Sequence, residues 1–250
     1  MITPHLTEEE YSATLEACAG DLLWQAEIEQ PPVDAFLVAS RLKLLVSEDP
    51  TLEARACYSR IGGARPSDAY TGLILLSNEA RPERRQWAVA HEIGESAAYR
   101  VFNRLGVNPT DAAPGARETV ANGLAGRLLL PRDWFLEDAR TCDWDLIELK
   151  RCYRTASHEL IARRVLELSP SPAIVTVIDQ GATTWRRANF RAVDRGLSPS
   201  EKPPWQKCHA DAVATESTRV DYPLTRVRCW PVHEPGWQRE ILLTELDETA

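Results

Sequence analysis

The stretch RQWAVAHEIGE, residues 85–95, decides how this chain is interpreted. On an α-helix, residues four apart lie on the same face, one turn above the other. His91 and Glu95 can therefore reach a single metal ion, with Glu92 beside them on the adjoining face. Two ligands and a carboxylate in this arrangement are typical of a metal that activates water with the help of a general base.

Such chemistry needs at least one more ligand, which we expect on a neighbouring helix. Glu118 is the natural candidate, because it stands at the start of a predicted helix over residues 116–130. The small residues of this helix allow close approach to another helix; they are Ala121, Gly123, Ala125 and Gly126. The alternative interpretation is that Glu118 is only a favourable acid in a first helical turn.

Glu95 stands where the helix of zinc hydrolases, with its His-Glu-x-x-His motif, has a second histidine. One imidazole and two carboxylates make a harder and more anionic site than two imidazoles and one carboxylate. Two carboxylates also formally neutralise a divalent ion, which then acidifies a bound water less. Three outcomes stay open: an active zinc site with altered tuning, a site that prefers manganese or iron, and a metal-free protein that keeps the fold.

Composition and charge restrict the class of protein. The chain has 250 residues, of which 44% are hydrophobic and 26% charged, as in ordinary globular proteins. Its net charge of -8 argues against general nucleic-acid binding, although a local basic patch is compatible with it. No apolar run approaches the ~18–20 residues that span a bilayer. The first ten residues lack a secretory signal and the six cysteines form no C-x-x-C pair, so we expect a cytoplasmic protein.

Helical periodicity dominates the first two thirds of the chain. Helices are predicted over residues 7–29 with Thr7 as N-cap, 34–42, 82–105, 116–130, 143–153 and 157–168, and around Trp134. Strands are predicted at residues 43–46 and 72–77, with turn chemistry at residues 62–68. The last two helices form a helix-turn-helix outline.

Beyond the proline-containing break at residues 169–172, the pattern changes to that of β-strands. Strands are predicted at residues 173–178, 183–190, 227–232 and 240–245, and a further short one around Pro203, Pro204 and Trp205. We find no internal repeat.

Two ordered motifs resemble one family. Residues 85–94, RQWAVAHEIG, resemble the R-x-F-x-x-A-H-E-x-G-H signature of the ImmA/IrrE-type metallopeptidases. Residues 118–131, ETVANGLAGRLLLP, resemble their second signature, E-x-x-A-N-x-F-A-x-x-L-L-M-P, with Leu124 in place of phenylalanine. Upstream, residues 32–39 are similar to the P-V-D-x-x-x-x-A segment of the same family. The resemblance covers about residues 30–170.

The resemblance and the sequence patterns together predict an α+β fold in three segments. These are a helix-rich, zincin-like metallopeptidase core with a small sheet at residues 1–135, a helix-turn-helix-like segment at 136–168 and a β-rich C-terminal region at 169–250. The resemblance implies His91 and Glu118 as zinc ligands, with Glu95 as the variant third ligand, and Glu92 as catalytic base and proton shuttle. The implied activity is limited proteolysis of a helix-turn-helix repressor, which releases stress-response, prophage or mobile-element genes. A regulatory protein that binds such a repressor or an antitoxin-like partner without cleaving it is the alternative.

Two other groups of residues are candidate binding sites. Cys208, His209, Cys229 and His233 provide two thiols and two imidazoles, but their spacing matches no common zinc finger, and scattered residues in a β-rich region are the favoured interpretation. The helix-turn-helix outline carries an excess of basic residues, namely Lys150, Arg151, Arg154, Arg163 and Arg164. Such a patch can contact DNA phosphates or an acidic partner, although a solvated basic face is more common and direct DNA binding is not favoured.

Overall fold

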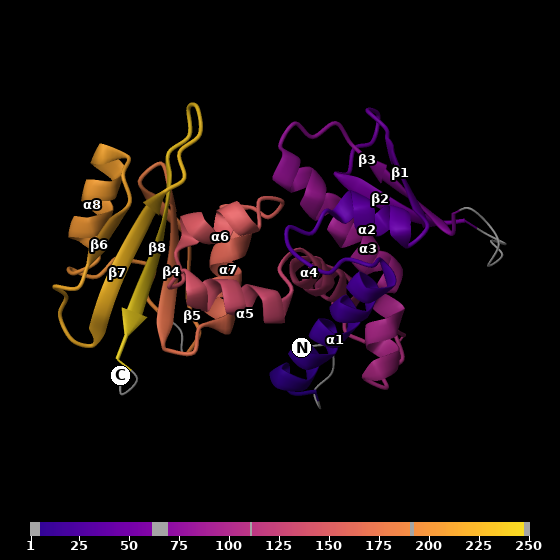
Figure 1. Cartoon of the computed structure of the whole chain (residues 1–250), viewed down its shortest axis with the longest axis horizontal. Helices are drawn as coiled ribbons and strands as arrows, with labels where there is room; N and C mark the ends of the chain where they lie inside the picture. The colour runs from indigo at the N-terminus through magenta and orange to yellow at the C-terminus, as the bar shows by residue number, and fades with distance from the viewer. Residues whose placement is uncertain (1–5, 62–69, 111, 191–192, 248–250) are drawn as a thin grey trace. The chain divides into compact units, whose positions relative to one another are not determined.

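The computed structural model describes residues 6–61, 70–110, 112–190 and 193–247; the turn predicted at residues 62–68 lies outside them. Helices and two separate sheets form an α+β fold, as predicted (Figure 1). The chain divides into two compact units, Met1–Asp138 with Arg151–Ser157, and Ala139–Lys150 with His158–Ala250. The predicted helical segment is therefore shared between the units, and the three-segment division at residues 135 and 168 stays a prediction. In the described parts, no helix is both long and apolar enough to cross a membrane.

The first two helices begin at side chains that cap them. Helix α1 (Glu8–Gln25) starts at the predicted N-cap, where Thr7 and Glu10 form a reciprocal capping box. Helix α2 (Ala35–Arg41) starts after Asp34, whose Oδ1 accepts a hydrogen bond of 2.9 Å from the N–H of Phe36. Helix α1 ends before the predicted residue 29, because Glu27 adopts a left-handed conformation with φ of 53°.

A three-stranded sheet lies in the first unit. Its order is β1-β3-β2, with β1 (Leu44–Glu48) parallel and β2 (Ala56–Arg60) antiparallel to the central strand β3 (Gly72–Leu76). Strands β1 and β3 agree with the sequence prediction. Strand β2 was not predicted, because its sequence ACYSR is largely exposed and lacks an apolar alternation. As an edge strand it nonetheless runs beside the helix that carries the candidate ligands.

The core of the first unit is the packing of α3 (Pro82–Arg104) against α4 (Ala116–Leu129). A methyl group at Gly94 would lie only 2.6 Å from the carbonyl oxygen of Ala121. The two helix backbones therefore touch at this point, and only glycine permits the contact. The N-terminal half of α3 is held to α2, because Gln86 accepts from the N–H of Ala35 at 2.7 Å and donates to Asp34 at 3.0 Å.

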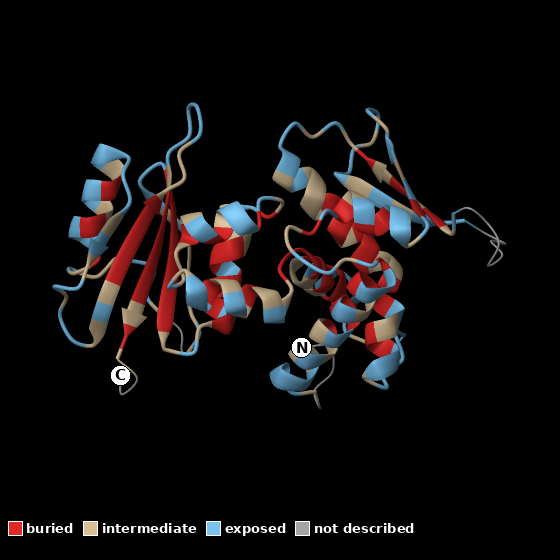
Figure 2. Cartoon of the chain, in the orientation of Figure 1, coloured by how far each residue is buried: buried red, intermediate tan, exposed pale blue. Residues whose placement is uncertain are grey.

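The second unit is built on a five-stranded antiparallel sheet of order β5-β4-β8-β7-β6. Its strands are β4 (Ala173–Asp179), β5 (Ala182–Ala188), β6 (Thr215–Ser217), β7 (Leu224–Pro231) and β8 (Arg239–Leu246). The preceding helices are α5 (Arg132–Thr141), α6 (Leu146–Cys152) and α7 (His158–Leu168). Helix α7 covers one face of the sheet and α8 (Lys202–Asp211) the other (Figure 1). Every residue of β4 is buried as a result, which Figure 2 shows as continuous red.

The strand predicted around Pro203, Pro204 and Trp205 is wrong, because these residues lie in helix α8. Both prolines occupy the first turn, where the backbone N–H has no helical acceptor and the fixed φ of proline suits the helix. Trp205 and Cys208 then lie one turn apart and face the sheet, with Cys208 fully buried.

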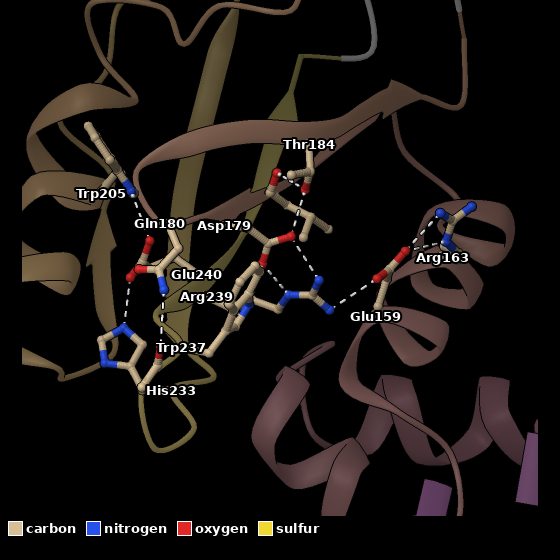
Figure 3. A network of polar contacts seen from close by, with 12 residues as sticks. Glu159, Arg163, Asp179, Gln180, Thr184, Trp205, His233, Trp237, Arg239 and Glu240 are labelled. Atoms are coloured by element: carbon tan, nitrogen blue, oxygen red, sulfur yellow. Dashed lines mark hydrogen bonds and ion pairs between the residues drawn. The ribbon is translucent and has the colours of Figure 1, made fainter. Parts of the chain in front are cut away.

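Ion pairs connect the elements of the second unit (Figure 3). The Arg239 guanidinium donates to both carboxylate oxygens of Asp179, at 2.6 and 2.8 Å, and to Glu159 on α7 at 3.1 Å. These hydrogen bonds lower the pKa of Asp179 despite its partial burial. Arg239 therefore joins α7, β4 and β8 through one side chain.

A second ion pair is almost completely buried. Arg186 donates to both oxygens of Glu201, at 3.0 and 2.9 Å, and their side chains are 5% and 1% exposed. Burial raises the pKa of Glu201, but hydrogen bonds from Arg186, Thr244 and the N–H of Ser198 together hold it below its usual value. Each buried charge thus has its partner.

Arg186→Met should lower the free energy of unfolding by about 3–5 kcal/mol, because it leaves the buried Glu201 carboxylate without its cation. Chemical denaturation measures the change. Arg187→Met is the matched control, since Arg187 is the next residue on β5 and is exposed; it should change stability by less than about 0.5 kcal/mol. Equal effects of the two variants would contradict the stabilising role of the pair.

Candidate metal centre

Three side chains from two helices meet at one point. His91 and Glu95 project from α3 and Glu118 from the first turn of α4, and one ligand atom of each lies within 4.8 Å of the others. The His91 Nε2 and Glu118 Oε2 atoms are 3.5 Å apart. His91 and Glu95 are 17% and 18% exposed, whereas Glu118 is 62% exposed. All three predicted ligands are therefore brought together, at a place that solvent can reach.

Asn122 orients two of these three side chains. Its amide Nδ2 donates to Glu118 Oε1 at 2.9 Å, so its Oδ1 is left as an acceptor and lies 3.1 Å from His91 Nδ1. Since Oδ1 only accepts, Nδ1 of a neutral His91 carries the proton and Nε2 keeps its lone pair. Nε2 is the atom that faces Glu118. An outer side chain that fixes the tautomer of a histidine in this way is typical of metal centres.

Asn122 was not among the site residues predicted from the sequence. The signal was present, because Asn122 follows Glu118 by four residues and so lies on the same face of α4. Residues 118–131, which resemble the second family signature, also contain Asn122. Only the structure reveals that Asn122 links the ligands of two helices.

Glu92 is not one of the three clustered ligands, and it is buried, with 6% exposure. Burial raises the pKa of its carboxyl, with a smaller contribution from Glu95 and Glu118, while His91 and a hydrogen bond from the N–H of Tyr58 act in the opposite direction. Tyr58 lies on β2, so the unpredicted edge strand helps to position this carboxylate. A raised pKa suits a group that both accepts and donates a proton near neutral pH.

Arg117 contacts the residue that replaces the usual histidine. Its Nε lies 2.5 Å from Glu95 Oε2, and its NH2 donates to the backbone oxygen of Glu95 at 3.3 Å. The guanidinium thus neutralises one of the two carboxylates of the cluster. This contact was not foreseen, because Arg117 precedes Glu118 by one residue and lies far from Glu95 in sequence.

The donor set fits a divalent metal ion. It consists of an imidazole with its lone pair directed to the cluster and two carboxylates, all within reach of a common point. Within the described residues no second group of this kind is found.

Cys208, His209, Cys229 and His233 do not form a second such group. Both imidazoles are instead hydrogen-bonded to the buried Glu240, with His209 Nδ1 at 2.9 Å and His233 Nε2 at 2.7 Å from the same oxygen; the His233 contact is drawn in Figure 3. The two thiols are buried and hydrogen-bonded to each other. Both histidines therefore serve as hydrogen-bond partners of the buried Glu240.

Two of the basic residues in the helix-turn-helix outline are engaged within the second unit. Arg163 donates to Glu159 at 2.8 Å and lies over the ring of Trp185 at 4.4 Å from its centroid. Arg164 is buried and pairs with Glu167 at 2.9 Å. These side chains are therefore used in packing, which weakens the case for contact with DNA phosphates.

Comparison with known families agrees with the geometry. Residues 54–165 match the model of the family Peptidase_M78, described as IrrE N-terminal-like domain. This part of the chain is similar to an IrrE-type domain. The match contains α3 and α4 and all four candidate residues, and a match to a peptidase family supports a metallopeptidase as the class of protein.

The chain is also similar to a solved structure, a Mycobacterium tuberculosis transcriptional regulator. The TM-score is 0.63 at 17% sequence identity, and the alignment covers 96% of this chain and 80% of the other. At this identity the likeness establishes the fold alone. A comparison with curated proteins gave no match.

Gly94→Ala should separate helices α3 and α4 and weaken metal binding. The added methyl would overlap the Ala121 carbonyl, at a cost of about 1–3 kcal/mol in unfolding free energy. Denaturation and zinc titration measure the two effects. Gly20→Ala on α1 is the control, because nothing lies within 4 Å of the added atom; it should stabilise the helix by about 0.5–1 kcal/mol. Wild-type zinc affinity in Gly94→Ala would contradict the proposed geometry.

The role of Glu95 is tested by two substitutions. Glu95→Ala removes a ligand and should lower metal affinity by more than about 100-fold, since even outer-shell changes cost about 10–100-fold. Glu95→His should retain the metal, because it places an imidazole at the same helical position. Metal content of the purified variants, measured by mass spectrometry, decides between them. Unchanged metal content in Glu95→Ala would remove Glu95 from the set of ligands.

Proposed function

We propose that the chain is a zinc-dependent endopeptidase of ImmA/IrrE type, which cleaves a helix-turn-helix transcriptional repressor and so derepresses stress-response or mobile-element genes. The observation that carries the proposal is the convergence of His91, Glu95 and Glu118 beside the buried Glu92. The match to a peptidase family supports the reaction class. Manganese or iron remains an alternative to zinc, since two carboxylates favour harder ions.

Each residue of the centre has a separate role in this proposal. His91, Glu95 and Glu118 hold the ion, and Asn122 keeps Nε2 of His91 available to it. When bound, a divalent metal supplies the Lewis acidity that makes water a nucleophile near neutral pH. Glu92 takes the proton from the attacking water and passes it to the amine that leaves when the peptide bond breaks.

The proposed setting is the cytoplasm. The six cysteines form no disulfide bonds in the described part of the chain, and Cys57 is exposed. Cysteines that form no disulfide bonds are typical of compartments where the cell keeps thiols reduced. A cytoplasmic protein would also meet its proposed substrate, a transcriptional repressor, without a transport step.

A second candidate function is supported by the contact of Arg117 with Glu95. A guanidinium bound to a candidate ligand can substitute for part of the charge of a metal ion. In this alternative the protein keeps the fold, holds no catalytic metal and regulates a repressor or an antitoxin-like partner by binding alone.

Glu92→Gln separates the two functions. If the chain is a peptidase, the variant should bind metal normally but cleave at least about 100-fold more slowly, since it lacks the proton acceptor. The assay mixes the full chain with the repressor encoded beside its gene, with and without a chelator, and follows the fragments by gel electrophoresis and mass spectrometry.

Glu53→Gln is the control, because Glu53 is exposed on the loop between β1 and β2 and is not one of the clustered residues. It should cleave at the wild-type rate. Repressor binding without cleavage by wild-type protein supplied with excess zinc would reject the peptidase and favour the regulatory alternative.

A further inference from the structure

A cleft opens beside the candidate metal centre within the first unit. It has a volume of about 830 Å³ and lies between the end of α2, the start of β1, strand β2 and the second half of α3. Glu95, Arg117 and Tyr58 line it, so it begins at the cluster that holds His91 and Glu118. A polypeptide bound at the centre could extend into this cleft.

The side chains that line the cleft are strongly biased in charge. Among them Glu95 is the only carboxylate, whereas five are basic: Arg41, Lys43, Arg60, Arg100 and Arg117. The chain as a whole has the opposite balance, with 37 acidic against 29 basic residues. The excess of positive charge is therefore a local property of the cleft.

Two of the basic residues are already neutralised, and two are not. Arg41 pairs with Glu27, and Arg117 with Glu95. Arg60 is exposed on edge strand β2 and has no carboxylate partner in the described part of the chain. Among the described residues, Arg100 donates hydrogen bonds to neutral groups, to Gln25 at 3.1 Å and to the hydroxyl of Tyr99 at 3.4 Å.

We propose that this cleft binds an acidic segment of the protein substrate, with Arg60 and Arg100 as the residues that select its carboxylates. The inference rests on the proposed function, because the cleft leads to the candidate peptidase centre. Guanidinium groups bind carboxylates through paired, charge-assisted hydrogen bonds. The partly exposed Tyr58 and Tyr99 add aromatic surface between these charges for the backbone and apolar side chains of the segment.

A peptide suits the cleft better than a nucleic acid, which is the other common polyanion. Proteins that bind nucleic acid usually present a basic face on a basic domain. Here five basic residues line a hollow that starts at the candidate ligands, on a chain with a net charge of -8. The net negative charge of the chain disfavours the binding of a long polyanion.

The test measures binding to two fluorescent peptides of equal length. One contains alternating glutamate and alanine, and the other has lysine in place of each glutamate. The full chain is titrated in the presence of a chelator, so that neither metal nor cleavage is required. We expect the glutamate peptide to bind at least about tenfold more tightly than the lysine peptide, and its affinity to fall as salt is raised.

Arg60→Glu and Arg100→Glu should each weaken binding of the glutamate peptide by about tenfold or more. Lys207→Glu is the charge-matched control, since Lys207 is exposed on α8 in the other unit; it should leave binding unchanged. Arg60→Gln provides a second, milder variant at an exposed position. Equal binding of the two peptides, or equal losses in the arginine and Lys207 variants, would overturn the inference. Preferential binding of a single-stranded oligonucleotide that is lost in the arginine variants would overturn it in favour of nucleic acid.

The outcome is separable from that of the proposed function. If the repressor is cleaved and Arg60→Glu leaves both peptide binding and KM unchanged, the cleft has no selective role although the peptidase stands. If no repressor is cleaved but the glutamate peptide binds through Arg60 and Arg100, the cleft is an acidic-peptide site on a protein that is not a peptidase.

Discussion

The contact between Gly94 and the Ala121 carbonyl is the constraint on which the candidate centre depends. Carboxylates have a shorter reach than imidazoles, so a cluster that contains two of them needs closely spaced backbones. The glycine lets α3 and α4 approach until an added methyl group would overlap the opposite backbone at 2.6 Å. At this spacing Glu95 and Glu118 share one point with His91. A larger residue at position 94 would move His91 and Glu95 on α3 away from Glu118 on α4.

The remaining polar contacts hold the ligand-bearing helices in place. Asn122 joins His91 to Glu118, while Gln86 and Asp34 tie α3 to the start of α2. The N–H of Tyr58 reaches Glu92 from the edge strand. Each of these contacts crosses between two elements, so the centre is supported by the surrounding unit as well as by its own helices. Precise positioning of this kind is what catalysis by a metal and a base requires.

Much of the fold could be predicted because its signals are local. The capping box at Thr7, the spacing of apolar residues on α3 and α4 and the β-branched run of β4 each identify an element without knowledge of its neighbours. The i, i+4 spacing likewise placed His91 and Glu95 on one face. Strand β2 escaped prediction because its backbone pairing, rather than its side chains, makes it a strand. Helix α8 was misread because prolines and an aromatic residue are compatible both with an edge strand and with a first helical turn.

The contacts of the centre itself were less predictable. Arg117 with Glu95 and Asn122 with His91 join residues that are more than twenty positions apart, and no periodicity encodes such pairs. The electrostatic character of the cleft is of the same kind, since its five basic residues come from four separate elements and their flanks. Distant residues become neighbours only through the packing of the whole unit.

The path of the chain between the two units limits how the protein can be divided. The chain passes from the first unit to the second after Asp138, returns to the first at Arg151–Ser157, and belongs to the second from His158 onward. In that returning piece Tyr153 is fully buried, packs on Phe135 with ring centroids 5.2 Å apart, and donates to Asp138 at 2.8 Å. Cleavage of the chain before residue 151 would remove Tyr153 from the first unit. Cleavage after residue 157 would separate residues 139–150 from the sheet of the second unit. The two halves are interleaved, so insertions, gene fusions and recombination that separate one half from the other are disfavoured throughout this stretch.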